Sequence, residues 1–458
     1  MGELVKALEK HHKDNVYPFH MPGHKRQADW IINPYEYDIT EISHFDDLHN
    51  PKEILKNLQD RFRDLYGCKE AFLILNGSTG GILSSISAVI NSGETILLAR
   101  NCHKSVYNGV FLKRCKTEYI YPQINTKTGI SLGISSKDVE NAFAKNSDIK
   151  AVVITSPTYE GVISNIDEIA DIVHCHKAIL MVDAAHGAHI GIKDGRTIGA
   201  SKADLVVTSL HKTLPAFTQT ALLCVNNDKL LSNIKKYINI FETTSPSYLF
   251  LAGAECCIDY ISDKNIFAEF DNKIQNLRAE LNKLSRLKLF ATEDYDYSKM
   301  VIDTSNANIS GKELKNLLLN KYNIELEMAS ANYALAMTSC MDTEEGFNRL
   351  ASALIEIDNA LSAADKHNNS SIKKTAKVYE AWECENANTE AVWWLSSRGY
   401  VSSEYVYIYP PGIPILVPGE IITEEIIKEL NEMILLGIEV KGLINNERIN
   451  VIEGCFYG

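Results

Sequence analysis

The chain contains Asp204-Leu-Val-Val-Thr-Ser209-Leu-His211-Lys212-Thr-Leu-Pro215, an apolar run that ends in a serine, a histidine and a lysine. The run has the composition of a buried β-strand, which places Lys212 at the end of that strand. Lysine is seldom buried unless its charge is paired or its amine takes part in chemistry. Two interpretations are open: an amine that extends into water, as most lone lysines do, or one that is used covalently.

A second apolar run ends in a carboxylate. Ala178-Ile-Leu-Met-Val-Asp183 leads into Ala-Ala-His186-Gly-Ala-His189. One strand that ends in Asp and a later one that ends in Ser-x-His-Lys supply what a pyridoxal phosphate (PLP) site needs: a Schiff-base lysine and a carboxylate for the pyridinium nitrogen. Asp183 would keep that nitrogen protonated, while Ser209 and His211 would hold the phosphate. The alternative is an aspartate that caps the following helix.

Short apolar runs alternate with helical patterns between residues 70 and 226. Most of these runs are almost continuously hydrophobic, as strands buried on both faces are. The alternation predicts a doubly wound α/β fold with a mainly parallel seven-stranded sheet, in which ligands bind beyond the carboxyl ends of the strands. The predicted strands are Ala71–Leu75, Thr95–Ala99, Glu118–Tyr121, Ala151–Thr155, Ala178–Asp183, Asp204–Ser209 and Ala221–Val225.

A glycine-rich segment, Asn76-Gly-Ser78-Thr79-Gly80-Gly81, follows the first of these strands and opens a helix. Glycines such as Gly80 let the backbone approach a ligand closely, and free N–H groups at a helix start favour an anion. Ser78 and Thr79 add hydroxyl donors. The segment matches neither the Walker nor the GxGxxG pattern. It is read as a phosphate cradle or as a plain turn with a helix cap.

Two further loops follow predicted strands. Arg100-Asn-Cys-His103-Lys-Ser105 carries a histidine that could stack over a flat cofactor ring, or be an ordinary loop histidine. Ser156-Pro-Thr158-Tyr159-Glu160-Gly161 has the composition of a turn and could place a hydroxyl near a cofactor or substrate.

Composition excludes several classes of protein. The chain has 458 residues and a formal net charge of −13, which argues against nucleic-acid binding. It contains no apolar stretch long enough to span a membrane, and its N-terminus does not have the pattern of a secretory signal. Ten scattered cysteines fit reduced thiols, so we expect a cytoplasmic protein. The histidines and cysteines form no complete coordination set, and we expect no metal.

The length predicts more than one domain. We divide the chain into an N-terminal segment (1–50), a large PLP-binding domain (51–275), a small α+β domain (276–370) and a C-terminal domain (371–458). The polar segment 367–374 is predicted to be a linker. The prolines of 407–420 argue against a central strand or a helix there.

Motifs along nearly the whole chain are similar to those of one family. The chain resembles the Orn/Lys/Arg decarboxylases, which have the fold-type I PLP-dependent transferase fold, in the short branch that lacks an N-terminal wing domain. The motifs, in order, are Phe19-His-Met-Pro-Gly-His-Lys25, Phe45-Asp-Asp-Leu-His49, Asn76-Gly-Ser-Thr79, Arg100-Asn-Cys-His-Lys-Ser105, Pro157-Thr-Tyr-Glu-Gly161, Asp183-Ala-Ala-His-Gly-Ala-His189, Ser209-Leu-His-Lys-Thr-Leu-Pro215, Thr243-Thr-Ser-Pro-Ser-Tyr248 and Tyr409-Pro-Pro-Gly-Ile-Pro414.

The resemblance implies a role for each matching residue. Lys212 would carry PLP, Asp183 would contact its ring nitrogen, and His103 and Ala185 would cover the two faces of the ring. Thr243 or Thr244 would reach the cofactor of a neighbouring subunit, so the active unit would be at least a homodimer. The resemblance also implies that the N-terminal segment (1–50) contributes to the active site and to a dimer. The residues implied to bind the rest of the cofactor are Ser78, Thr79, Gly80, His186, Ser209 and His211.

Two departures from the family pattern concern contacts outside the bond-breaking chemistry. Residues 397–405 blur the usual Gly-Arg-x-x-Ala-Glu pattern, and Ile82 stands where Asn is frequent. The resemblance implies decarboxylation of arginine or lysine, with arginine slightly favoured and ornithine still open, to agmatine or cadaverine and CO2. The alternatives are an aminotransferase or lyase on the same fold, or a non-catalytic PLP-binding homologue.

A basic substrate needs an acidic partner for its distal cation. Asp46, Asp47 and Glu420 are candidates, and the alternative for each is a solvated carboxylate or a helix cap.

Overall fold

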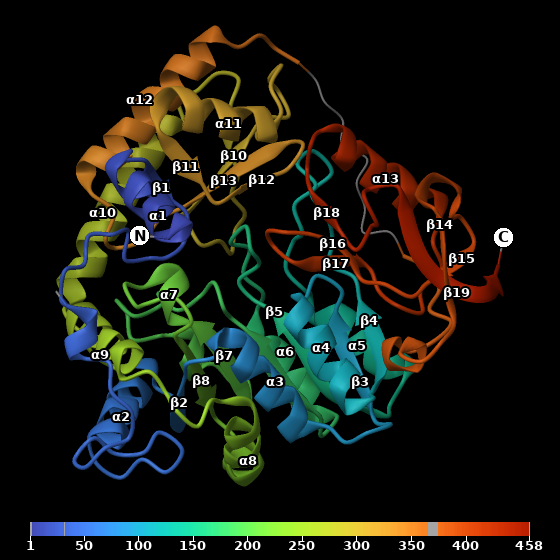
Figure 1. The fold of residues 1–458 in the computed structure, drawn as a ribbon, viewed down its shortest axis with the longest axis horizontal. Coiled ribbons are helices and arrows are strands. Elements are labelled where there is room, and N and C mark those ends of the chain that lie inside the picture. Colours follow the sequence, from blue (N-terminus) through green and yellow to red (C-terminus); the bar gives the residue numbers. More distant parts are fainter. Residues whose placement is uncertain (1, 32, 365–373, 458) are drawn as a thin grey trace.

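The computed structural model describes residues 2–31, 33–364 and 374–457 (Figure 1). Its larger part is built on a seven-stranded sheet with the order β2-β8-β7-β6-β5-β3-β4, in which only β8 runs antiparallel to its neighbours. The predicted fold class and the mainly parallel sheet are confirmed. The strands are β2 (Glu70–Ile74), β3 (Thr95–Ala99), β4 (Lys116–Ile120), β5 (Ile149–Thr155), β6 (Ile179–Asp183), β7 (Leu205–Ser209) and β8 (Ala221–Val225).

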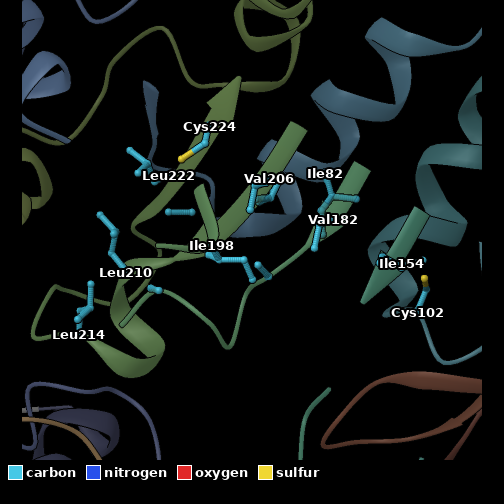
Figure 2. Packing of buried hydrophobic residues seen from close by; sticks show 14 of the residues in the cluster. Ile82, Cys102, Ile154, Val182, Ile198, Val206, Leu210, Leu214, Leu222 and Cys224 are labelled. Carbon is cyan, nitrogen blue, oxygen red and sulfur yellow. The ribbon is translucent and has the colours of Figure 1, made fainter. Parts of the chain in front are cut away.

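Burial explains why these strands are so apolar. Every residue of β3, β7 and β8 is buried. Figure 2 shows Val182 of β6, Val206 of β7 and Ile82 of α3 close together in the core between sheet and helix. On the surface of the sheet, α3 packs against α4 and α8, and α5 packs against α6. The helices of this part are α2 (Ile54–Tyr66), α3 (Gly77–Val89), α4 (Lys104–Lys113), α5 (Ser136–Lys145), α6 (Ile166–Cys175), α7 (Leu210–Thr213), α8 (Leu231–Phe241) and α9 (Tyr248–Ile261).

A smaller antiparallel sheet with the order β12-β13-β10-β9 lies above the large sheet in Figure 1. The N-terminal segment belongs to this region, because β1 pairs in parallel with β11. The N–H of Gly23 then donates to the carbonyl oxygen of His211 at 2.8 Å, next to Lys212. The elements are α1 (Glu3–Lys13), β1 (Tyr17–Phe19), α10 (Lys264–Leu281), β9 (Lys288–Leu289), β10 (Lys299–Asp303), α11 (Gly311–Tyr322), β11 (Ile324–Leu326), β12 (Met328–Ala329), β13 (Tyr333–Met337) and α12 (Glu344–Ala360).

The C-terminal part has two three-stranded sheets, with the orders β14-β19-β15 and β17-β16-β18. The prediction that 407–420 contains no central strand is wrong, because β16 is the middle strand of its sheet. Its residues precede Pro410, whereas Pro414 lies in an edge strand, where a missing N–H is tolerated. The elements are β14 (Thr389–Trp393), β15 (Tyr400–Ser402), β16 (Val406–Ile408), β17 (Ile413–Leu416), α13 (Glu424–Leu435), β18 (Val440–Lys441) and β19 (Arg448–Phe456).

The predicted linker 367–374 lies outside the described residues except for Lys374, and the four domain limits stay predictions. Within the described ranges, every helix is too short or too polar to cross a lipid bilayer.

Candidate active site

A cavity lies at the carboxyl ends of the parallel strands, where the sequence predicted ligand binding. It gathers predicted site residues from segments that are far apart along the chain. Each of them lies at the end of a strand of the large sheet or in the loop or helix start that follows one. The predicted residues that line the cavity are Ser78, His103, Asp183, Ala185, His186 and Lys212.

Lys212 lies in α7, the single helical turn that follows β7. Its Nζ is 2.9 Å from Nε2 of His186. Burial lowers the pKa of Lys212, against the opposing charges of Asp183 and Glu327. A lowered pKa increases the fraction of neutral amine, which is the form that attacks a carbonyl carbon. The environment of Lys212 therefore suits covalent chemistry.

Asp183 is the last residue of β6, and it is 2% exposed. Its Oδ1 accepts a hydrogen bond from the N–H of Ala185 at 3.1 Å. Burial raises the pKa of this carboxyl group, and Lys212 and the N–H of Ala185 oppose that effect. A buried carboxylate with one oxygen held in this way can pair with a protonated ring nitrogen.

His103 is the N-cap residue of α4, and its Nδ1 accepts a hydrogen bond from the N–H of Ser105 at 3.2 Å. This bond places the proton of the neutral ring on Nε2. Burial and the charge of Lys212 lower the pKa of His103 to about 4. The imidazole is therefore neutral near pH 7, and its orientation is fixed by the start of the helix.

The glycine-rich segment forms the first turn of α3. Ser78 lines the cavity and Thr79 is exposed. A Cβ on Gly80 would lie 3.1 Å from the Cβ of Asn76, so a side chain there would be crowded. The free N–H groups and the dipole at the start of this 13-residue helix favour an anion.

Ser209 and His211 lie just before Lys212. The Ser209 hydroxyl is buried and has no hydrogen-bond partner among the described residues. The Nδ1 of His211 donates to the carbonyl oxygen of Thr220 at 2.9 Å, which leaves Nε2 for a ligand. Burial lowers the pKa of His211 to about 4. With the start of α3, these groups fit the phosphate of PLP, as Asp183 and Lys212 fit its ring nitrogen and aldehyde.

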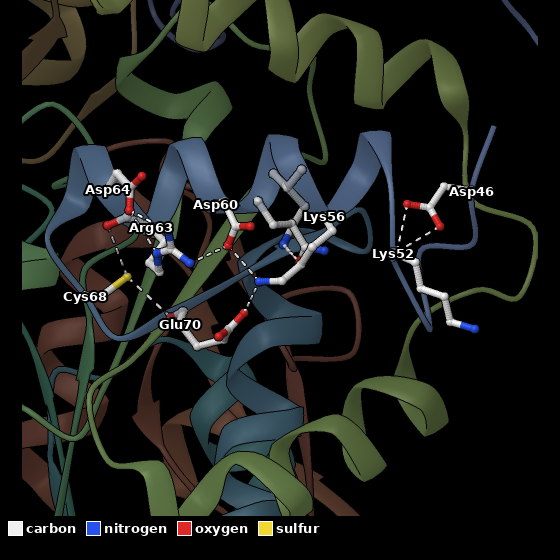
Figure 3. A network of polar contacts seen from close by, with 10 residues as sticks. Asp46, Lys52, Lys56, Asp60, Arg63, Asp64, Cys68 and Glu70 are labelled. Carbon is white, nitrogen blue, oxygen red and sulfur yellow. Dashed lines mark hydrogen bonds and ion pairs between the residues drawn. The ribbon is translucent and has the colours of Figure 1, made fainter. Parts of the chain in front are cut away.

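Two carboxylates proposed for the substrate accept hydrogen bonds from nearby backbone N–H groups. Asp46 accepts hydrogen bonds from the N–H groups of Lys52 and Glu53 at 3.0 and 2.8 Å, just before α2 (Figure 3). Asp47 accepts from the N–H of His49 at 2.8 Å. Neither carboxylate lines the cavity in the described part of the chain.

Seven other predicted residues lie outside the cavity lining in the described part of the chain. Four of them are within three residues of Ser78 or Lys212, namely Thr79, Gly80, Ser209 and His211. The other three lie elsewhere. Glu420 is 1% exposed and forms an ion pair with Arg100, with 2.9 Å between Oε2 and Nη2. Thr243 and Thr244 are exposed on the surface of this chain. The structure thus brings together the residues predicted around the cofactor ring. Five candidates lie apart from them: Asp46, Asp47, Glu420, Thr243 and Thr244.

The turn after β5 contributes more to the cavity than the sequence indicated. Thr158, Tyr159 and Glu160 all line it. Glu160 is 7% exposed and accepts a hydrogen bond from the hydroxyl of Tyr333 at 2.7 Å. Burial raises the pKa of Glu160. The available signal was its place in the turn that follows β5, at the carboxyl end of the sheet.

The C-terminal part supplies a wall of the cavity from the motif Tyr409–Pro414, to which the sequence assigned no role in the site. Pro411 and Ile413 line it, and between them the carbonyl oxygen of Gly412 accepts from the N–H of Lys104 at 3.0 Å. Asn101, Ser131 and Thr155 complete the set of lining residues that the sequence did not single out.

Known proteins are similar to this chain over most of its length. The family model described as Orn/Lys/Arg decarboxylase, major domain, matches residues 3–307, and the one for the C-terminal domain matches residues 362–434. An arginine decarboxylase of Halalkalibacterium halodurans is 30% identical over 470 residues, which cover 96% of this chain and 94% of the relative.

Solved structures show the same fold. The constitutive lysine decarboxylase of Escherichia coli has a TM-score of 0.77 at 17% identity, over 99% of this chain and 82% of that one. A structure of SPT with a PLP internal aldimine has a TM-score of 0.60 at 17% identity, over 75% of this chain and 87% of that one. The family-model match over residues 3–307 and the 30% identity to an arginine decarboxylase over 96% of this chain show that the chain belongs to the Orn/Lys/Arg decarboxylase family.

Proposed function

We propose that this protein uses PLP to remove the α-carboxyl group of a basic amino acid, arginine in preference to lysine, with release of CO2. The observation that carries the proposal is that Lys212 and Asp183 line the same cavity, in a chain of this family. The preference for arginine rests on the relatives named arginine decarboxylase, which match this chain over nearly their whole length.

PLP, when bound, supplies a conjugated ring that accepts the electrons of the broken bond. Lys212 would hold it covalently, Asp183 would contact its ring nitrogen, and Ala185 and His103 would cover the two faces. The groups that would bind its phosphate are Ser78, Thr79, Gly80, Ser209 and His211, with His186 beside the lysine.

The chain itself orients the reacting groups and holds protons. The buried carboxylate of Asp183 favours a protonated ring nitrogen, which is the better electron acceptor. The proton on Nε2 of neutral His103, or a proton on the amine of Lys212, is available for return to the substrate Cα. The cavity must also hold the carboxyl group of the substrate perpendicular to the ring, because orientation selects the bond that breaks.

Glu160 is the residue we propose for the distal cation of the substrate. It lines the same cavity as Lys212, and the hydroxyl of Tyr333 holds one of its oxygens. A carboxylate can pair with a guanidinium through two parallel hydrogen bonds, whereas an ammonium is a point charge. A bound cation would also stabilise the ionised form of this buried group.

We further propose that the protein works as a homodimer or larger homo-oligomer in the cytoplasm. Thr243 and Thr244 are exposed in the single chain, where a neighbouring subunit could bring its own cofactor to them. The mass of the protein in solution, measured by sedimentation, tests this part.

One assay tests the reaction. The purified protein with added PLP is incubated with arginine, lysine or ornithine, and both the amine and CO2 are measured. We expect agmatine and CO2 in equal amounts from arginine, at a higher rate than cadaverine from lysine. Lys212→Ala should abolish the reaction, whereas Lys202→Ala, at an exposed lysine paired with Asp171, should not change it. A keto acid or ammonia in place of the amine would contradict the proposal.

A further inference from the structure

Lys299 is a second lysine next to the cavity. It is the first residue of β10, is 1% exposed, and has its Nζ 3.3 Å from Nδ1 of His186. A Cβ on Gly161 would lie 2.7 Å from Cγ of Lys299, so the glycine leaves room for this side chain. The position of Lys299 is therefore closely defined by its surroundings.

The nearby carboxylates do not form ion pairs with Lys299. Within the described residues, no carboxylate oxygen lies within 4.0 Å of its Nζ. Asp296 contacts His189 at 3.1 Å, and Glu327 accepts a hydrogen bond from the N–H of Met21 at 2.9 Å. The only hydrogen bond of the Lys299 ammonium to a described residue is the one to His186.

The charges around Lys299 act over longer distances. Burial lowers its pKa to about 8, against the charges of Asp296 and Glu327, and Lys212 and Lys25 lower it further. The positive charge of Lys299 also lowers the pKa of Glu160, although burial dominates there. Lys299 therefore loses its proton more easily than an ordinary lysine.

Both ring nitrogens of His186 face a lysine amine. Nε2 is 2.9 Å from Nζ of Lys212, and Nδ1 is 3.3 Å from Nζ of Lys299. Burial and the two lysines hold the pKa of His186 well below its usual value, so the imidazole is neutral and has one N–H and one lone pair. An ammonium group only donates, and two ammonium groups would need two lone pairs. Both contacts are hydrogen bonds only when one of the two lysines is uncharged.

We infer that Lys299 is a positioning residue for the proposed decarboxylation, because it controls the charge of Lys212 through His186. The ammonium of Lys299 donates to Nδ1, so the ring proton is on Nε2 and is donated to the neutral amine of Lys212. When Lys212 takes up a proton, Nε2 gives its own and Nδ1 receives one from Lys299. The sum is one proton moved from Lys299 to Lys212, with the imidazole neutral before and after.

Trace acetylation of the full chain, from which any bound PLP has been removed as its oxime with hydroxylamine, tests this coupling. Acetic anhydride reacts with neutral amines, and peptide mass mapping at a series of pH values gives a midpoint for each lysine. In Lys299→Met, Lys212 can donate as an ammonium to His186, so its midpoint should rise by about one pH unit, a tenfold lower reactivity near neutral pH. Lys104→Met is the matched control, because this nearby cation faces Tyr407 and not His186, and the midpoint of Lys212 should stay unchanged.

The reverse measurement covers the case in which Lys299→Met does not fold. Coupling is reciprocal, so Lys212→Met should raise the midpoint of Lys299 by the same amount. Unchanged midpoints for both lysines in folded variants, or a fall of either one, would overturn the inference. The relevance of the coupling to catalysis rests on the proposed function, which the separate assay of amine and CO2 decides without reference to the labelling.

Discussion

Gly412 brings the main chain of the C-terminal part directly against the imidazole of His103. A Cβ at this glycine would lie 3.1 Å from Nε2 and 3.2 Å from Cδ2 of the ring, and its φ is +84°. The N–H of Lys104, the first residue of α4, donates to the carbonyl oxygen of Gly412. The ring of His103, the start of α4 and the loop around Gly412 are therefore held together by direct contacts. Gly412 and His103 are nevertheless far apart in the sequence.

Substitution of Gly412 by alanine should displace the ring of His103. We expect Gly412→Ala to lower kcat by about tenfold or more, since misplacement of a group at a reacting centre is costly. The positive φ should also lower the free energy of unfolding by about 1 kcal/mol or more. Steady-state kinetics and urea unfolding measure the two effects.

Gly437→Ala is the control that separates the effect of backbone strain from the effect of the contact with His103. Gly437 has a φ of +71° but no atom of the described residues within 4 Å of its Cβ position, so alanine there should destabilise the chain without changing kcat. Equal kinetics for the two variants would show that the contact with His103 does not matter for the reaction.

Removing the charge of Glu160 should lower kcat/KM for arginine. Glu160→Gln removes the charge while keeping the shape, and a hydrogen bond to a charged group contributes about 1.5–3 kcal/mol. We therefore expect kcat/KM for arginine to fall about 10- to 100-fold, with thermal stability almost unchanged. Glu140→Gln, at an exposed site on α5, serves as the control. If Glu160→Gln kept the kcat/KM of the wild type, another group would have to meet the distal cation.

Breaking the ion pair between Arg100 and Glu420 should loosen the C-terminal part. Arg100 also donates to the carbonyl oxygen of Ile415 at 3.1 Å, so it anchors this segment to the large sheet. Arg100→Met leaves Glu420 buried without its cation, and the free energy of unfolding should fall by about 3–5 kcal/mol. The double variant with Glu420→Gln should lose less, because no buried charge remains.

An exposed pair provides the comparison for this buried one. Lys202→Met breaks an ion pair with Asp171 on the surface and should cost less than about 1 kcal/mol. Urea unfolding of the three variants gives the order of these losses, and a loss in Arg100→Met as small as that in Lys202→Met would contradict the anchoring role.

The burial of His103 should make stability depend on pH in a defined range. Its pKa is about 4 in the folded chain against an ordinary value of 6.5, so between these values the unfolded chain binds a proton that the folded chain does not. The free energy of unfolding should therefore fall as the pH drops through this window, by at most roughly 3 kcal/mol from this residue. Above pH 6.5 the contribution is constant.

His103→Gln isolates this effect from that of the other titrating groups. We measure urea unfolding of wild type and variant at several pH values. The unfolding free energy of the wild type minus that of the variant should fall from pH 6.5 toward pH 4. A difference that stays constant across this range would show that the pKa of His103 is not lowered in the folded chain.

The sequence predicted the large sheet because its strands are buried on both faces and so are apolar throughout. It predicted Lys212, Asp183 and His103 as neighbours because residues that follow parallel strands meet at one edge of the sheet. Such reasoning depends on local patterns. It could not find Gly412 or Lys299, because their place at the cavity comes from packing between distant parts of the chain.

Local patterns also could not show that Glu420 and Asp46 lie away from the cavity. Glu420 is an acidic residue near a proline-rich loop, and only the folded chain brings Arg100 to it. Asp46 precedes a helix, and its hydrogen bonds to the N–H groups of Lys52 and Glu53 were the open alternative of a cap. The sequence does not show which hydrogen-bond donor a carboxylate contacts in the folded chain.

The pairing of β1 with β11 has a consequence for synthesis on the ribosome. Tyr17–Phe19 is made before the large sheet, yet its partner Ile324–Leu326 is made only after the whole of that sheet. Until then the early strand has an unsatisfied edge, and Gly23 lacks the support that later holds it beside the end of β7. The region around Lys212 can therefore reach its final form only late in translation, and a nascent chain stalled before residue 324 would expose an edge prone to pair with other chains.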